Sequence, residues 1–130
     1  MKLTVPDYII LIVDDLDRAL HFYTDVLGLR LGHRSGDYAQ LETGATRLGF
    51  YTREAMAKTL GLSLHPPAQD APGFEIGFKV PDVDAAFAEL VARGASPVTP
   101  PTTRPWGQRT AYVQDPEGHL IELAQDLGRS

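Results

Sequence analysis

The stretch YIILIVDDLDRALHFYTDVLG at residues 8–28 has a counterpart later in the chain, EIGFKVPDVDAAFAELVARG at residues 75–94. At an offset of 67 residues the two stretches carry the same residue at five positions: Ile9 and Ile76, Val13 and Val80, Asp15 and Asp82, Asp17 and Asp84, Ala19 and Ala86. Both end on glycine, Gly28 and Gly94, once a gap of one residue is allowed. A pattern that occurs twice in 130 residues indicates two copies of one structural module.

Each copy predicts a strand followed by a helix. The opening run of β-branched residues is typical of a buried strand. Asp15 and Asp82 stand where a helix N-cap is expected, because a carboxylate there accepts hydrogen bonds from the free amides of the first turn. Apolar residues then recur at helical spacing as far as Gly28 and Gly94, and glycine is the usual left-handed stop of a helix.

Three short strands are expected after each helix. In the first half they fall near residues 29–34, 37–42 and 46–51, and in the second half near residues 96–99, 108–114 and 119–125. The run Asp115-Pro116-Glu117-Gly118 predicts a tight turn before the last strand. Between the halves we expect a short helix at residues 52–59 and an exposed, proline-containing linker at residues 60–73.

The order strand, helix, three strands therefore occurs twice. We predict an α+β fold in which two βαβββ modules form one cupped mixed sheet with the helices on its outer face. The chain is expected to be a single domain over residues 1–130, with module one at about 5–52, a linker at about 53–73 and module two at about 74–126. Open sheet edges favour association, so we also expect a homodimer.

Composition narrows the classes of function. The net charge of −5 and the absence of any Lys/Arg run argue against nucleic acid as a partner, which needs a concentrated basic face. The chain contains no cysteine, so disulfides, thiolate metal sites and a cysteine nucleophile are excluded. No apolar run is long enough to span a membrane, and the first residues do not have the pattern of a signal peptide. We expect a cytoplasmic protein with no membrane partner.

Three segments carry a resemblance to a known superfamily. DYIILIVDDLDRALHFYTDVLGLRL, GFEIGFKVPDVDAAFAELVARGA and YVQDPEGHLIELAQ occur in the order and spacing seen in vicinal-oxygen-chelate proteins, which include glyoxalases, bleomycin resistance proteins and dioxygenases. The chain looks most similar to the metal-free, bleomycin-resistance-like members. The superfamily contains isomerases, dioxygenases, thiol transferases and non-catalytic drug binders, so the resemblance predicts the fold more specifically than the function.

The resemblance also implies where a metal would be held. The four ligand positions of the metal-dependent members fall on Tyr8, Gly49, Glu75 and Glu122. Such members usually place His, Gln or Glu at the first position and Glu or His at the second, which Tyr8 and Gly49 do not match. We therefore expect no cofactor. If a metal binds, Glu75 and Glu122 would hold it, and two carboxylates suit Mg²⁺ or Mn²⁺ better than Fe²⁺, Zn²⁺ or Ni²⁺.

The aromatic residues suggest a binding surface. Strand alternation places Tyr8, Tyr51 and Tyr112 on the cup-facing side, and Tyr112 opposite Glu122. Trp106 lies in the pattern P-W-G-x-R, from Pro105 to Arg109, which is similar to the corresponding stretch of bleomycin-binding proteins. Two alternatives are that Trp106 is a core residue and that Glu122 only pairs with Tyr112 or an arginine. The expected ligand-binding residues are Tyr8, Arg47, Tyr51, Glu75, Trp106, Tyr112 and Glu122.

The histidines predict no catalytic group. His21 and His119 are expected to be exposed, His65 lies in the linker, and only His33 is placed to face the cup. No Ser/His/Asp motif and no glycine-rich phosphate loop is present. Catalytic residues therefore stay unassigned.

Two functions compete. The first is a small-molecule binding protein of the bleomycin-resistance type, which sequesters an antibiotic or other aromatic natural product in a dimer-interface groove without chemistry. The second is a metal-dependent, glyoxalase- or dioxygenase-like lyase, isomerase or oxidoreductase that uses Glu75 and Glu122.

Overall fold

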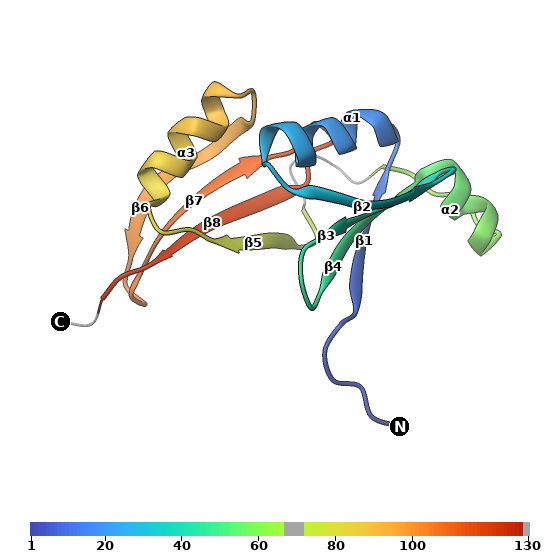
Figure 1. Ribbon diagram of the computed structural model, residues 1–130, viewed down its shortest axis with the longest axis horizontal. Helices are drawn as coiled ribbons and strands as arrows, with labels where there is room; N and C mark the ends of the chain where they lie inside the picture. Colours follow the sequence, from blue (N-terminus) through green and yellow to red (C-terminus); the bar gives the residue numbers. More distant parts are fainter. Residues whose placement is uncertain (67–71, 129–130) are drawn as a thin grey trace. The chain divides into compact units, whose positions relative to one another are not determined.

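The computed structural model describes residues 1–66 and 72–128. The chain divides into two compact units, residues 1–66 and residues 67–130. Each unit has a four-stranded sheet with a helix packed on one face (Figure 1). Among the described residues, no helix is both long enough and apolar enough to cross a membrane.

The first unit begins with a strand and a helix. Its elements are β1 (Tyr8–Val13), α1 (Leu16–His21), the π-helical turn η1 (Phe22–Val26), β2 (Arg30–Ser35), β3 (Tyr38–Glu42), β4 (Arg47–Thr52) and α2 (Arg53–Leu60). The strand order is β1-β4-β3-β2, with β1 parallel to β4 and the other pairs antiparallel.

The second unit repeats this arrangement. Its elements are β5 (Glu75–Lys79), α3 (Val83–Ala92), β6 (Ser96–Arg104), β7 (Gln108–Gln114) and β8 (Leu120–Asp126). The strand order β5-β8-β7-β6, with β5 parallel to β8, matches that of the first unit. The α+β class and the two βαβββ modules are thereby confirmed. The joining of the two sheets into one cupped sheet stays a prediction.

Side chains at the helix ends explain why the elements begin and end where they do. The carboxylate of Asp15 accepts a hydrogen bond from the Arg18 amide at 3.0 Å, and that of Asp82 accepts one from the Ala85 amide at 3.1 Å. Gly28 and Gly94 have φ values of 79° and 108°, which side chains other than glycine rarely adopt. The predicted caps and stops are thus confirmed.

The buried core of each unit lies between its sheet and its helix. In the first unit Tyr23 and Phe50 are fully buried, and their ring centroids lie 4.9 Å apart. In the second unit Val83 of α3 is fully buried, as are Val113 and Ile121 on the facing strands. Burying such side chains contributes roughly 1.5–3 kcal/mol each, so the helix-facing side of each sheet supplies much of its stability. The opposite side of each sheet is left for other contacts.

The strand β6 differs from the expected strand, whereas the helix between the two halves agrees with the expected one. The strand expected near residues 96–99 is wrong in length, because β6 continues to Arg104 through two irregularities in its pairing with β7. Irregular pairing accommodates Pro100 and Pro101, which lack the amide hydrogen that regular pairing needs. The short helix between the halves is confirmed as α2. Of the linker expected at residues 60–73, residues 67–71 lie outside the described residues.

Candidate functional site

The side of the first sheet that faces away from α1 carries three of the expected site residues. Tyr8 pairs with Arg47 across β1 and β4, and Ile12 pairs with Tyr51 in the same register. The alternate residues Leu48 and Phe50 are buried on the helix side. Strand alternation therefore places Tyr8, Arg47 and Tyr51 on one face, as the sequence predicted.

An aromatic hollow forms on this face. It is lined by Ile10, Tyr38, Tyr51 and Met56 and has a volume of about 380 Å³. The rings of Tyr38 and Tyr51, which are paired across β3 and β4, lie edge to face with centroids 6.3 Å apart. The Tyr51 hydroxyl lies 3.1 Å from the Thr59 hydroxyl on α2, so α2 forms one wall of the hollow.

Gly49 lies on this same face of the sheet, between Arg47 and Tyr51 on β4. A β-carbon added to Gly49 would lie 2.7 Å from Ile10 Cδ1, 3.0 Å from the Ala39 carbonyl oxygen and 3.4 Å from the Tyr38 hydroxyl. Contacts below 3.0 Å require a neighbouring atom to move. A side chain at position 49 would therefore have to displace the end of the flexible Ile10 side chain, and it would enter van der Waals contact with the Tyr38 hydroxyl.

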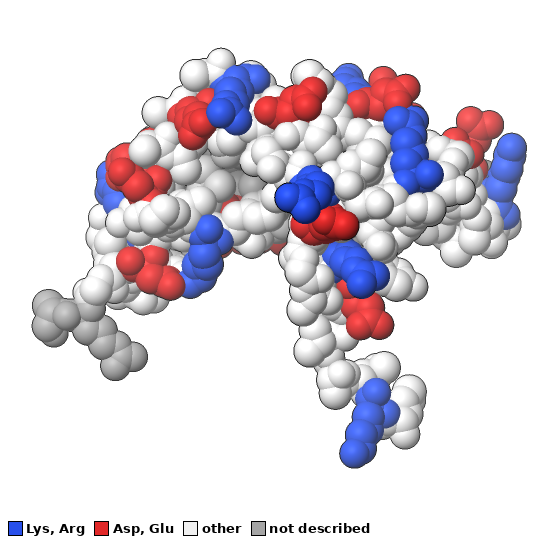
Figure 2. Space-filling model, viewed as in Figure 1, with Lys and Arg blue, Asp and Glu red and all other residues white. Residues whose placement is uncertain are grey.

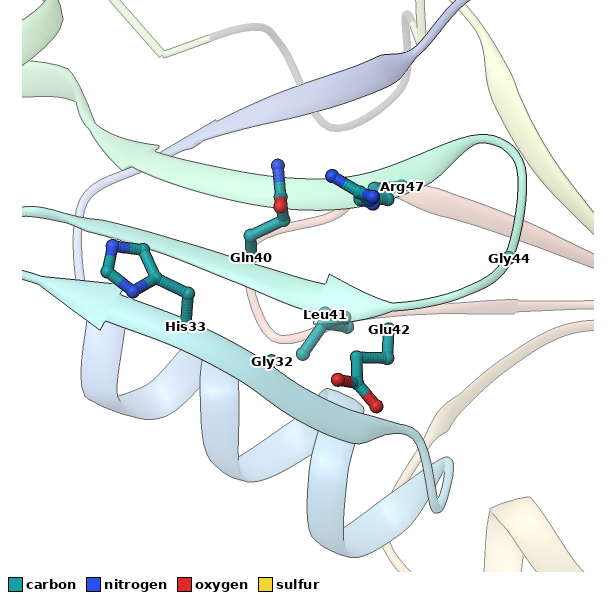
Figure 3. Close-up of a pocket in the computed structure, with 7 residues that line it drawn as sticks. All are labelled: Gly32, His33, Gln40, Leu41, Glu42, Gly44 and Arg47. Atoms are coloured by element: carbon teal, nitrogen blue, oxygen red, sulfur yellow. The ribbon is translucent and has the colours of Figure 1, made fainter.

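A second, more polar hollow adjoins these residues on β2, β3 and β4 (Figure 3). It has a volume of about 310 Å³ and is lined by Gly32, His33, Gln40, Leu41, Glu42, Gly44 and Arg47. His33 pairs with Gln40 across β2 and β3, and Gln40 pairs with Gly49 across β3 and β4. Gln40 donates a hydrogen bond to the Tyr38 hydroxyl at 2.8 Å, which links the polar hollow to the aromatic one.

The other expected polar residues gather in the second unit. Tyr112 lies opposite Glu122, as predicted, and its hydroxyl donates a hydrogen bond to Glu122 Oε2 at 2.8 Å. Gly77 is paired with Glu122 across β5 and β8, and a β-carbon at Gly77 would lie 3.2 Å from Glu122 Oε1. The missing side chain at Gly77 thus leaves room for the Glu122 carboxylate against β5. Glu75 lies two residues earlier on β5 and faces the same side.

Additional negative charge is unfavourable in the cluster formed by Glu75, Tyr112 and Glu122. Partial burial, and then the negative charge of Glu122, raise the pKa of Glu75. Burial also raises the pKa of Tyr112, with a further contribution from its hydrogen bond to Glu122. The Tyr112 hydroxyl therefore stays protonated and available as a donor to Glu122 at neutral pH.

Trp106 and Arg109 belong to the same sequence pattern but lie in different environments. Trp106 is 64% exposed in the turn between β6 and β7, and its indole nitrogen donates to Gln108 Oε1 at 2.9 Å. This exposure excludes the alternative that Trp106 is a core residue. Arg109 instead reaches the helix side, where it forms two hydrogen bonds of 2.8 and 2.9 Å with the carboxylate of Asp84 on α3.

The expectation that His119 is exposed is wrong. Its side chain is only 13% exposed, and its ring nitrogen Nδ1 lies 2.8 Å from Asp115 Oδ2. Asp115 is buried and also accepts hydrogen bonds from the Glu117 and His119 amides, so this pair stabilises the β7–β8 turn. His21, as expected, is exposed, and it pairs with Asp25.

Charges elsewhere on the surface are mixed in sign. In the view of Figure 2, basic side chains lie next to acidic ones and do not gather into one basic patch. Ion pairs among the surface charges include Arg34 with Asp17 at 2.8 Å and Lys79 with Asp126 at 2.6 Å. Surface pairs of this kind contribute little to stability individually.

Tyr38, Gln40 and Met56 are site residues that the sequence reasoning missed. Tyr38 and Gln40 alternate with the buried residues Ala39 and Leu41 on β3, so strand parity alone would have placed them beside Tyr51. Met56 had no comparable signal, because its place beside the sheet depends on the packing of α2.

The repeated βαβββ unit with a helix on one sheet face is the architecture that the superfamily resemblance predicted. The model of the Glyoxalase/Bleomycin resistance protein/Dioxygenase superfamily matches residues 5–123, and the chain belongs to this superfamily. The uncharacterized protein YraH of Bacillus subtilis is 35% identical over 123 residues, which cover 90% of this chain and 94% of that protein. A probable lactoylglutathione lyase of Synechocystis is 33% identical over 119 residues, which cover 87% of this chain and 88% of that protein.

A solved structure has the same fold. The crystal structure of a glyoxalase/bleomycin resistance protein/dioxygenase from Nocardioides matches with a TM-score of 0.86. Its sequence is 24% identical, and the match covers 100% of this chain and 88% of that chain. At this identity the likeness supports the fold and carries no statement about activity.

The residues at the superfamily's metal positions do not fit a nitrogen-rich metal site. Tyr8 is 60% exposed, and Ile10 and Tyr38 contact the space that a side chain at position 49 would enter. Glu75 and Glu122 are the two carboxylates at these positions. Among residues 1–66 and 72–128, no three His, Asp or Glu side chains lie close enough together to hold one metal ion.

Proposed function

We propose that this protein is a small-molecule binding protein of the bleomycin-resistance type. In this proposal it sequesters an antibiotic or another aromatic natural product and does not change it chemically. Tyr8, Tyr51, Trp106 and Tyr112 would supply aromatic surface to the ligand. The polar contacts would come from Arg47, Glu75 and Glu122.

One observation carries this proposal. Gly49 stands where the superfamily resemblance places a metal ligand in metal-dependent members, and Ile10 and Tyr38 contact the space that such a side chain would enter. The side chains of Ile10 and Tyr38 also supply apolar and aromatic surface to the hollow beside Tyr51. Apolar walls with a few polar groups are typical of sites that bind flat organic molecules. Glycine at position 49, with Ile10 and Tyr38 beside it, therefore favours ligand binding over metal-assisted chemistry.

A binding screen with product analysis tests the proposal. The purified protein would be screened by thermal shift against aromatic antibiotics and other planar natural products. Each ligand that raises the Tm would then be recovered after prolonged incubation and analysed by mass spectrometry. The proposal predicts that at least one ligand binds and is recovered intact. Conversion of every binder to a product that differs in mass or, for an isomer of the same mass, in chromatographic retention would overturn it.

The assembly belongs to the proposal. We propose a homodimer whose interface forms the ligand groove, in the cytoplasm. Support comes from β1, an edge strand of its sheet, because Tyr8 is 60% exposed and Ile9 is 38% exposed. Exposed apolar residues on an edge strand are favourable contacts for a second chain.

The metal-dependent enzyme is the alternative, and the Glu75–Glu122 pair favours it. Both carboxylates match superfamily ligand positions, and one relative is a probable lactoylglutathione lyase. The test is to assay formation and cleavage of lactoylglutathione with Mg²⁺, Mn²⁺, Ni²⁺ or Zn²⁺ added. Metal-dependent turnover that the Glu122→Gln variant loses would support the enzyme. Equal background rates for both proteins would reject this activity.

A further inference from the structure

We infer that the open face of the first sheet binds an aromatic acid, with the ring in the aromatic hollow and the acidic group in the adjoining polar hollow. This inference rests on the proposed binding function and names its ligand class. It concerns residues of the first unit only. It adds Tyr38, Gln40 and His33 to the residues that select the ligand.

The aromatic hollow is suited to a flat ring. Tyr38 and Tyr51 stand edge to face, and Ile10 and Met56 complete a lining that is almost entirely apolar. The Tyr38 hydroxyl already accepts a hydrogen bond from Gln40, and the Tyr51 hydroxyl contacts Thr59. The polar ends of both tyrosines are thereby engaged, which leaves ring surface for the ligand.

The polar hollow presents hydrogen-bond donors that lack partners. Among the residues that the structure describes, the side chain of Arg47 forms no ion pair or hydrogen bond, although the Arg47 backbone is held by Asp7 and by β1. His33 likewise has no side-chain partner within the described part of the chain. Gln40 uses one amide hydrogen on Tyr38 and keeps a second one to donate.

The charge balance favours an anion. Glu42 also lines the polar hollow, but its side chain lies against Gly32, where its Cγ would be 2.9 Å from an added β-carbon. Its carboxylate lies 3.7 Å from the Arg30 guanidinium, which offsets its charge. Arg47 therefore remains as the uncompensated charge of the hollow. A guanidinium binds carboxylate, sulfate or phosphate oxygens with charge-assisted hydrogen bonds.

The two hollows are spaced for one small molecule. Tyr38 and Gln40 are two residues apart on β3, which corresponds to roughly 7 Å along a strand. The hollows share a border, because Gln40, which lines the polar hollow, donates a hydrogen bond to the hydroxyl of Tyr38, which lines the aromatic hollow. A ring joined to an acidic group by two or three bonds therefore spans them.

Three matched probes test the inference: 3-(2-naphthyl)propanoate, its primary amide and 3-(2-naphthyl)propylamine, titrated calorimetrically into the full-length protein at neutral pH. We expect the acid to bind roughly tenfold more tightly than the amide, which is the size of one charge-assisted hydrogen-bond contribution. Arg47→Gln should weaken binding of the acid roughly tenfold and weaken the amide much less, so that the preference for the acid is lost. Tyr38→Leu should weaken both.

Arg34→Gln is the matched control. It removes the same charge from the same sheet, but Arg34 lies on the helix side and pairs with Asp17. The control should keep the preference for the acid. The inference is overturned if amide and acid bind equally, if the amine binds best, or if Arg34→Gln loses the preference as fully as Arg47→Gln. Binding of the amide alone would still leave the proposed binding function standing, whereas failure of all three probes would count against both.

Discussion

At the residue scale, the structure decides between two predicted roles for Trp106. It is a surface residue and not a core residue. It is 64% exposed, and its indole nitrogen donates a hydrogen bond to Gln108, two residues further along the chain. An indole in this position does not stabilise the core. It is free to meet a ligand, since stacking on a planar ring needs an exposed face.

Replacement of Trp106 by alanine tests this role. We expect Trp106→Ala to lower the free energy of unfolding by less than about 1 kcal/mol, because surface side chains contribute little to folding. If Trp106 contacts the ligand, affinity should fall roughly ten- to hundredfold. Urea denaturation and ligand titration of the same variant give both values. Leu123→Ala, at a buried position of the same unit, should cost about 2–5 kcal/mol. A comparable loss for Trp106→Ala would show that it packs in a core.

Arg109 and Asp84 provide a residue-scale prediction about pH. The hydrogen bonds from Arg109 hold the pKa of Asp84 below its ordinary value of 3.8. A carboxylate with a lowered pKa stabilises the folded state fully above its ordinary pKa, and this contribution is lost as the pH falls through the lowered pKa. Wild type should therefore exceed Asp84→Asn in urea midpoint at neutral pH, and the difference should shrink below about pH 4.

The control for this pH dependence is on the same helix. Glu89 pairs with Arg93 one turn along the same helix, whereas Arg109 holds Asp84 by two hydrogen bonds from β7, so Glu89→Gln should lower the urea midpoint less than Asp84→Asn does. A difference between wild type and Asp84→Asn that stays constant from neutral to strongly acidic pH would contradict the assigned ion pair. A Glu89→Gln effect as large as that of Asp84→Asn would do so as well.

At the element scale, η1 accounts for the one-residue gap between the two repeats. Twelve residues separate Asp15 from Gly28, but only eleven separate Asp82 from Gly94. The structure accommodates the extra residue in a π-helical turn, in which the Leu27 amide bonds the Phe22 carbonyl five residues earlier at 3.0 Å. A π-turn closes on the fifth residue and not on the fourth, so it holds one residue more than the corresponding α-helical turn.

Deletion of Thr24 tests this interpretation. Removing one residue from η1 should convert it to regular α-helix and leave a folded protein, because Tyr23 and the residues before it keep their positions. Deletion of the exposed Ala88 from α3 is the control. It should rotate the end of that helix by about 100° and move Leu90 off the sheet. Circular dichroism and thermal melts compare the two. Equal destabilisation by both deletions would contradict the role given to η1.

Local signals in the sequence predicted most of the elements. The caps at Asp15 and Asp82, the stops at Gly28 and Gly94 and the turn before Gly118 depend on neighbouring residues, so the sequence was sufficient. The length of β6 and the environment of His119 were not predictable in this way. Both depend on residues that come together only after folding: the irregular β6–β7 pairing and the buried Asp115 carboxylate.

The sequence predicted the part of the candidate site that depends on strand alternation, and it did not predict the part that depends on packing between elements. Strand parity correctly set Tyr112 opposite Glu122 and placed Tyr51 with Arg47. The hollow at Tyr38 and Met56 escaped the sequence reasoning, because it requires α2 to pack beside β4. The absence of a side chain at Gly49 was visible in the sequence. That Ile10 and Tyr38 contact the space beside it was not.

At the scale of the whole molecule, the prediction concerns assembly. Open edges and exposed apolar residues on β1 lead us to expect a homodimer, with a mass twice the 14.2 kDa of the chain. Multi-angle light scattering at micromolar concentration measures this directly. A mass of one chain across that concentration range would contradict the proposed homodimer and its interface groove.

The central proposal is that this superfamily member binds an aromatic ligand without a metal. The most direct test is the Kd of the best ligand from the screen, measured by calorimetry on protein stripped with a chelator and again with Mn²⁺, Ni²⁺ or Zn²⁺ added. We predict the same Kd within about twofold in every case, because Gly49 and its neighbours Ile10 and Tyr38 offer no metal ligand. A Kd that becomes measurable only when one metal is restored, and that is lost again in Glu122→Gln, would contradict the proposal and identify a metal centre.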